Sequence, residues 1–306
     1  MSSSWRRREV PLLSCEFTET TNIAHTGDRR YCARCQEHGT PASTQFREFL
    51  LGHIHHAVYG WATPAISYVV ACIGALLALR STRWALISEG RTRRNWLIFA
   101  SFSLGLGIWS MHFIAMLGFS VSGVEIRYNV PLTVLSLIIA IGVVGVGLFT
   151  VGYSNRPLLA LPVGGVTTGL GVAAMHYMGM AAMRLPGSLM YDHVLVWASV
   201  AIAIFAATAA LWAALNIRGT LAVAAAAPVM GVAVCAMHYT GMAAISVNLD
   251  PNETPPGGVV GLQFVFPLAV GLGTYVFASA LAFAVAPSKN ASRPPVFTGP
   301  VAPLRR

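Results

Sequence analysis

The segments MHFIAM at 111–116, MHYMGM at 175–180 and MHYTGM at 237–242 repeat one pattern, Met-His-[Phe/Tyr]-x-[Ala/Gly]-Met. The copies lie 64 and then 62 residues apart, each near one end of a long apolar run. A histidine inside a membrane helix costs free energy unless it is paired or coordinated, so each copy is a candidate functional position. Three copies at equivalent positions predict one shared site.

The composition is that of a polytopic membrane protein. Of the 306 residues, 55% are hydrophobic and only 10% are charged. One membrane helix needs about 20 apolar residues, and seven stretches qualify: 57–79, 95–119, 130–152, 157–183, 193–216, 220–247 and 261–286. We therefore predict an all-α polytopic membrane protein with seven transmembrane helices. The motif ends every second helix, which indicates a repeated helix-pair unit.

The placement of charge predicts how the chain crosses the inner or plasma membrane. Basic residues gather after the first, third, fifth and seventh stretches, for example in the predicted loop 80–94. The alternate loops carry Glu125 with Arg127, Arg184 with Asp192, and Asp250 with Glu253. By the positive-inside rule the N-terminus lies outside and the C-terminus in the cytoplasm. The basic N-terminal tail argues against this orientation, but the charge difference between successive short loops supports it in every pair. The net charge of +9 thus reflects topology, and no nucleic-acid partner is expected.

Three regions are expected along the chain. Residues 1–49 form a polar N-terminal extension, either disordered or translated from a misassigned start; 50–286 form the membrane domain; 287–306 form a Pro-rich cytoplasmic tail. The extension contains Cys32-x-x-Cys35-x-x-His38, but a closed structural zinc site takes four ligands at suitable spacing. A second histidine group, His53, His55 and His56, precedes the first span, where it is either solvated or completes a site.

The chemistry of the motif favours a soft metal. Positions i and i+4 share a helix face, so His112 pairs with Met116, and the other two copies pair His and Met in the same way. Imidazole suits copper, zinc, iron and nickel, and thioether sulfur favours Cu(I). The alternative is packing, because Met is a common flexible filler of apolar cores. Packing alone does not require a histidine in all three copies.

These motifs resemble the MHYT family of bacterial integral membrane sensor domains, whose naming sequence is spelled in full at 237–240. The stretches HHAVYGWATP at 55–64 and YNVPLTVLS at 128–136 are also similar to that family. The resemblance implies copper binding, sensing of a diatomic gas (O2, CO or NO), and candidate ligands at Met111, His112, Met116, Met175, His176, Met180, Met237, His238 and Met242. In the first copy, Phe113 and Ala115 depart from the pattern.

The resemblance is to a stand-alone form without a fused output domain, which would signal, if at all, through a separate partner in the lipid bilayer. We expect a sensor and not an enzyme. The alternatives are a copper-handling transporter and a membrane redox protein that holds copper or haem. No Asp, Glu, Lys or Arg lies within the predicted spans, which argues against ion-coupled transport but leaves a thioether path for copper open.

Overall fold

The computed structural model describes residues 54–55, 60–121, 124–250 and 257–285. Within these residues, six helices are long and apolar enough to cross a membrane. They are α2 (Ala62–Leu86), α3 (Gly90–Met116), α4 (Val130–Tyr153), α5 (Pro157–Ala181), α6 (His193–Asn216) and α7 (Thr220–Ala243). The chain is therefore a multi-pass membrane protein, as predicted. The predicted regions 1–49 and 287–306, with Cys32, Cys35 and His38, lie outside the described residues.

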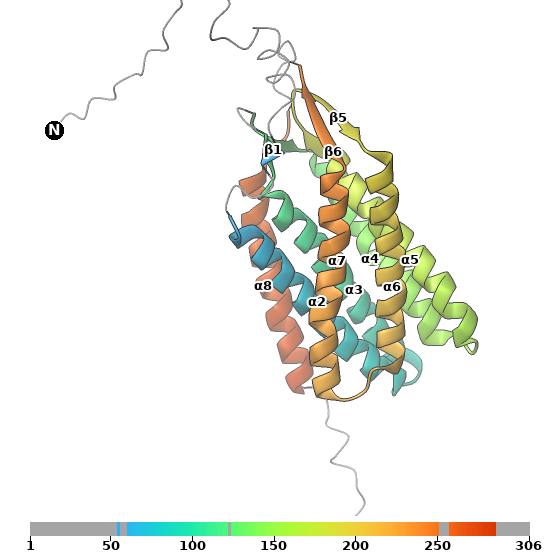
Figure 1. The fold of residues 1–306 in the computed structure, drawn as a ribbon. Coiled ribbons are helices and arrows are strands. Elements are labelled where there is room, and N and C mark those ends of the chain that lie inside the picture. Colours follow the sequence, from blue (N-terminus) through green and yellow to red (C-terminus); the bar gives the residue numbers. More distant parts are fainter. Residues whose placement is uncertain (1–53, 56–59, 122–123, 251–256, 286–306) are drawn as a thin grey trace, which may run out of the picture. The chain divides into compact units, whose positions relative to one another are not determined.

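The predicted seventh span coincides with helix α8 (Gly261–Val285). Its stacked Tyr275 and Phe99 rings have centroids 5.7 Å apart, and the Tyr275 and Ser103 hydroxyls are hydrogen-bonded, so α8 packs on α3. Figure 1 shows α8 beside the bundle that the other helices form. Its described apolar stretch is Val270–Ser279, so six spans are established and the seventh stays a prediction.

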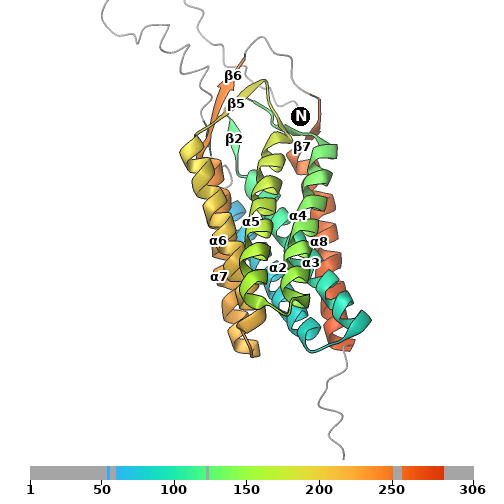
Figure 2. The same cartoon turned by 90° about the vertical axis from the view of Figure 1, so that its right-hand side faces the viewer.

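The six helices form a closed ring of three hairpins, α2–α3, α4–α5 and α6–α7. Each helix packs mainly on its two neighbours in the chain, and α2 closes the ring against α7. Within each hairpin the turn is short, at residues 87–89, 154–156 and 217–219, and the three turns lie at one end of the bundle (Figures 1 and 2). The longer connections, which contain the strands, lie at the other end. The three hairpins confirm the predicted helix-pair repeat.

One glycine in each repeat lets neighbouring hairpins approach closely. Gly105, Gly169 and Gly231 each stand seven residues before a motif histidine. A Cβ atom at Gly105 would lie 2.7 Å from the Cα of Ile141 on α4, and one at Gly231 would lie 2.6 Å from the sulfur of Cys72 on α2. A Cβ at Gly169 would overlap the backbone of Ile204 on α6. Helices associate in lipid through such small residues, so this glycine register sets the spacing of the ring.

Two capping residues tie successive repeats together at the strand end. The side chain of Asn129 accepts from the backbone N–H of Leu132, and that of Asp192 accepts from Val194 and Leu195, so they satisfy free N–H groups at the starts of α4 and α6. The backbone N–H groups of Asn129 and Asp192 donate to the carbonyls that follow α5 and α7, each at 2.8 Å. Each cap therefore fixes the end of the next motif helix.

Short strands at this end lie outside the all-α membrane bundle. They are β1 (Ile54–His55), β2 (Ser120–Val121), β3 (Arg127–Tyr128), β4 (Met183–Arg184), β5 (Gly187–Tyr191), β6 (Ile245–Leu249) and β7 (Val259–Val260). β1 pairs with β2, β3 lies between β4 and β7, and β5 pairs with β6, all antiparallel. In β6, Ile245, Val247 and Leu249 are buried and alternate with exposed residues. This period of two was visible in the sequence, but it directly follows the apolar run of α7 and was read as helix 220–247.

The helix ends also differ from the prediction on the basic side. α2 extends to Leu86 and α3 begins at Gly90, so the predicted loop 80–94 is helix except at 87–89. Arginine is a good helix former and can extend its charged head from a helix end to water, so basic residues need no loop. Arg93 lies with its guanidinium 4.8 Å from the ring centre of Tyr153 and donates to the carbonyl of Gly152, which caps the end of α4.

The glycine register makes a prediction about stability. Replacing Gly169 by Ala should lower the thermal unfolding midpoint in detergent, because overpacking costs about 1–3 kcal/mol. Gly142→Ala is the control, since a Cβ there has nothing within 4 Å; its midpoint should stay the same or rise, as Ala favours helix over Gly. Equal midpoints for the two variants would contradict the close-approach role of Gly169.

Candidate metal centre

The three motif histidines meet at the centre of the ring, near the strand end. His112 on α3, His176 on α5 and His238 on α7 are each at most 1% exposed. The Nδ1 atom of His112 lies 3.1 Å from Nδ1 of His176 and 3.1 Å from Nδ1 of His238. The ring centroids are 4.9 to 5.2 Å apart, and each pair of rings is nearly perpendicular. The rings thus form a three-bladed arrangement with their Nδ1 atoms together.

The small residue of each motif makes room for an imidazole. A Cβ at Gly179 would overlap Nε2 of His112, and a Cβ at Gly241 would overlap Nε2 of His176. Each of these histidines therefore packs against the backbone of the next motif helix. In the first copy, Ala115 stands at the equivalent position. The glycine in Met-His-Tyr-x-Gly-Met is thus part of the site.

The polar atoms of the triad are poorly satisfied by the protein alone. A neutral imidazole has one N–H, and three Nδ1–H groups at this spacing would point at one another. Each Nε2 atom is buried and has no hydrogen-bond partner within the described part of the chain. An unpartnered buried polar group costs about 1–3 kcal/mol. A single cation would take up all three Nδ1 lone pairs, while the Nε2 atoms would keep their protons and stay without partners. The histidines are the one group of His, Cys, Asp or Glu among the described residues that could hold a metal ion.

All six predicted methionine ligands are buried. Met111, Met116, Met175, Met180, Met237 and Met242 are at most 3% exposed. The structure therefore brings the three imidazoles together and buries the six methionine side chains on the same three helices. Of the other two methionines near the second motif, Met178 is half-buried and Met183 lies outside the helices in β4. Of the second histidine group, His53 and His56 lie outside the described residues, and of His55 only the backbone pairing in β1 is described.

The aromatic residue after each histidine packs edge-on against it. The ring centroids of Phe113 and His112, Tyr177 and His176, and Tyr239 and His238 are 4.8, 4.9 and 5.0 Å apart, with nearly perpendicular planes. In strands β3 and β5, Tyr128 and Tyr191 cover Phe113 and Tyr177 with centroids 6.1 and 6.0 Å apart. Burial raises the pKa of Tyr128 and of Tyr191, so both stay neutral at physiological pH.

A hydrogen bond compensates for the missing hydroxyl of the first copy. The hydroxyl of Tyr177 lies 2.6 Å from that of Ser199 on α6. Phe113 has no hydroxyl, but the indole N–H of Trp109, one turn earlier, donates to Ser136 of α4 at 3.0 Å. Ser136 and Ser199 both also donate to a carbonyl three residues back. The first copy, which has Phe113 in place of tyrosine, therefore keeps a side-chain hydrogen bond between its motif helix and the next helix. Only the tertiary contacts reveal this compensation.

A family model described as the bacterial signalling protein N-terminal repeat, MHYT, matches residues 105–164, 169–227 and 231–299. This chain belongs to the MHYT family. Each matched repeat begins six residues before a motif methionine, so the family repeat and the three-hairpin ring have the same period. The chain is thus a membrane MHYT signalling sensor domain with a buried three-histidine cluster that could hold a metal ion.

The MHYT domain has curated relatives among larger signalling proteins. It is 36% identical over 253 residues to the bifunctional diguanylate cyclase/cyclic di-GMP phosphodiesterase MucR of Pseudomonas aeruginosa, covering 81% of this chain and 37% of the relative. It is 31% identical over 223 residues to the signalling protein YkoW of Bacillus subtilis, covering 68% of this chain and 26% of the relative. The chain therefore spans about a third of the length of these relatives. No solved structure matches it.

The Tyr177–Ser199 contact can be tested by removing one hydroxyl. Tyr177→Phe should lower the unfolding free energy by about 1 kcal/mol, the usual worth of a hydrogen bond. Phe113→Tyr is the matched reverse change and should give no gain, because Trp109 already occupies Ser136. Thermal unfolding of both variants in the same detergent measures the difference. A stabilised Phe113→Tyr protein would show that the first copy is not compensated.

Proposed function

We propose that this MHYT domain is a membrane sensor, not an enzyme, in which His112, His176 and His238 bind a copper ion. The convergence of the three Nδ1 atoms carries the proposal. Three nitrogens bound at about 2.0–2.1 Å to one ion would be about 3.3–3.6 Å apart, by simple geometry from typical metal–imidazole distances. The observed 3.1 Å for two of the pairs needs only a small outward movement of the rings.

The donor set favours copper over other metals. Imidazole nitrogen with thioether sulfur is a soft combination that suits Cu(I), whereas Mg²⁺ and Ca²⁺ prefer oxygen ligands. The six buried methionines supply the sulfur, with Met116, Met180 and Met242 on the same helix faces as the histidines. A Cu(I) ion with an open coordination position would bind a diatomic gas such as O2, CO or NO. The chain's own part is to hold three imidazoles away from water and from competing oxygen ligands.

The same geometry supports a route for the signal. Each histidine is on a different hairpin, and Gly179 and Gly241 transmit the position of one imidazole to the next motif helix. A change in the triad therefore alters the spacing of all three hairpins at once. Because packed interfaces have discrete arrangements, a small shift can select between two bundle states. We infer that the output passes to a signalling partner, and the relatives named for cyclic di-GMP synthesis and hydrolysis make turnover of that nucleotide the first output to examine.

We also propose the orientation predicted by charge, with seven spans. The short-turn end of the bundle carries Arg156 and Arg218 together with the arginines of α2 and α3, whereas the strand end carries Glu125, Asp192 and Asp250. By the positive-inside rule, the short turns face the cytoplasm and the metal centre lies near the outer face. An N-terminus outside, a C-terminus inside and α8 as the seventh span complete this topology.

The proposed copper site predicts which variants lose metal. His112→Ala, His176→Ala and His238→Ala should each reduce copper retained after purification, because losing one ligand removes much of the affinity of a small ligand set. Gly179→Ala should also lower it, since the new methyl group displaces the His112 ring. Gly142→Ala is the matched control. Metal analysis by mass spectrometry gives the copper and zinc contents.

Wild-type copper content in all three folded histidine variants would overturn the site, as would purified protein that holds only zinc after copper supplementation. Two further results would redirect the function. Copper uptake into proteoliposomes would favour transport, and a Soret band would favour a haem protein. A copper spectrum that changes with CO, NO or O2 would support the sensor.

The topology is testable with single cysteines and a membrane-impermeant maleimide in intact cells. In a background with the native cysteines replaced, a cysteine at Asp250 should be labelled and one at Glu89 should not, because only the first faces outward. Labelling after the membrane is permeabilised confirms that the Glu89 position is reactive. The inverse pattern would place the metal centre on the cytoplasmic side.

A further inference from the structure

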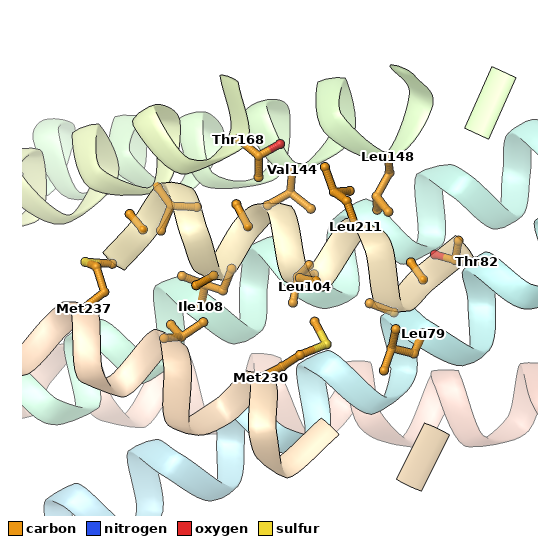
Figure 3. Close-up of a pocket in the computed structure, with 18 residues that line it drawn as sticks. Leu79, Thr82, Leu104, Ile108, Val144, Leu148, Thr168, Leu211, Met230 and Met237 are labelled. Atoms are coloured by element: carbon orange, nitrogen blue, oxygen red, sulfur yellow. The ribbon is translucent and has the colours of Figure 1, made fainter. Parts of the chain in front are cut away.

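An apolar cavity of about 50 Å³ lies inside the ring, next to the histidine triad on the side of the short turns. Figure 3 shows it running between Met237, which directly precedes His238, and Thr82 and Leu148 at the other end. It is separate from the imidazole layer, and none of the three histidines lines it.

The lining of the cavity follows the internal repeat. Ile108, Val172 and Val234 stand four residues before the motif histidines, and Leu104, Thr168 and Met230 stand eight residues before them. Positions four and eight residues back lie on the same helix face as the histidine. The cavity therefore lies on the same axis as the triad and directly next to it along the bundle.

The other three helices contribute an equivalent layer. Leu79, Leu148 and Leu211 line the cavity, and each stands twelve residues after a buried serine, namely Ser67, Ser136 and Ser199. On α6 the lining is mainly alanine, at Ala203, Ala206, Ala207, Ala210 and Ala214. Small side chains at these positions leave the central space unfilled.

The cavity suits an apolar guest better than water. A water molecule needs about 10–15 Å³ of such volume and two to four polar partners. Only Thr82 and Thr168 bring hydroxyl groups to the lining, and Thr168 already donates to the carbonyl of Val143 at 3.4 Å. The hydroxyl of Thr82 has no partner among the described residues, so it is the one lining hydroxyl that a water molecule in the cavity could hydrogen-bond. An apolar cavity of about 150 Å³ stays dry and binds benzene or xenon, so this smaller one fits a guest smaller than benzene, such as a single xenon atom.

The side of the cavity toward α6 and α7 is the least covered. Ala206, Ala210, Met230 and Val234 line it and are only half-buried, whereas Leu79 and Val144 on α2 and α4 are at most 2% exposed. Apolar solutes concentrate in hydrocarbon rather than in water. Entry from the lipid between α6 and α7 is therefore the direct route.

We propose that this cavity is a second ligand site, which takes one small uncharged apolar molecule from the bilayer and presents it to the triad through Met237. Occupancy of the cavity stands on its size and lining alone. Delivery to a bound metal rests on the function proposed above, and it gives the sensor a store of gas on the axis of its metal centre.

Xenon is the probe for occupancy, because it is apolar, uncharged and of suitable size. In protein labelled with 13C-methyl methionine, xenon pressure should shift the Met230 and Met237 signals and saturate. The Met190 signal should not saturate, since this residue lies on β5 and is 48% exposed. Ala207→Leu fills the cavity and should abolish the shifts at Met230 and Met237. Ala209→Leu, two residues away on an exposed position of the same helix, should preserve them.

If Ala207→Leu does not fold, Ala206→Ile narrows the same space from the half-buried side and should weaken the shifts. Linear, non-saturating shifts, or shifts that both filling variants leave unchanged, would overturn the site. His112→Ala should lose copper yet keep the xenon shifts, so failure of the copper proposal and failure of the cavity proposal give different results. In copper-loaded protein, Ala207→Leu should slow CO association without changing copper content; an unchanged rate would overturn delivery.

Discussion

The mutual contact of three buried imidazoles is the constraint on which the rest of the bundle depends. Nδ1 atoms 3.1 Å apart require three helices to converge at one depth, which fixes the rotation and height of α3, α5 and α7. Nothing in the described protein satisfies the Nε2 atoms. Each unpartnered Nε2 atom costs stability in an apolar interior, and a cation held by the three Nδ1 atoms would leave the Nε2 protons in place. Through its Nδ1 atoms the triad could hold a metal ion.

Small residues make the convergence sterically possible at two levels of the repeat. Seven residues before the histidine, a glycine in each repeat lets one hairpin lie against the next. Three residues after the histidine, Gly179 and Gly241 receive the neighbouring imidazole, and the first repeat has Ala115 there. Gly231 packs on Cys72 where the other repeats pack on isoleucine, which assigns this half-buried cysteine a packing role. Small side chains also leave space on α6, where a row of alanines borders the axial cavity.

The repeats are equivalent in geometry but not in chemistry, and their differences show which contacts matter. Trp109 supplies to Ser136 the hydrogen bond that Phe113 cannot make, so the tie between a motif helix and its neighbour is retained although its donor has changed. Asn129 and Asp192 cap different helices, yet both hold the end of the following motif helix.

The sequence by itself determined the membrane class, the helix-pair repeat and the identity of the three histidines, because apolar runs and a repeated polar residue are local signals. It missed β5 and β6, since the alternation at 245–249 continues directly from an apolar helix. It also placed Arg80 and Arg83 in a loop, because charge marks the membrane boundary and not the helix end. Only the tertiary structure decided that Gly179 touches His112, that Trp109 replaces a tyrosine hydroxyl, and that an apolar cavity follows the triad along its axis. Each of these depends on which residues of distant segments meet, and that is fixed by helix packing rather than by local pattern.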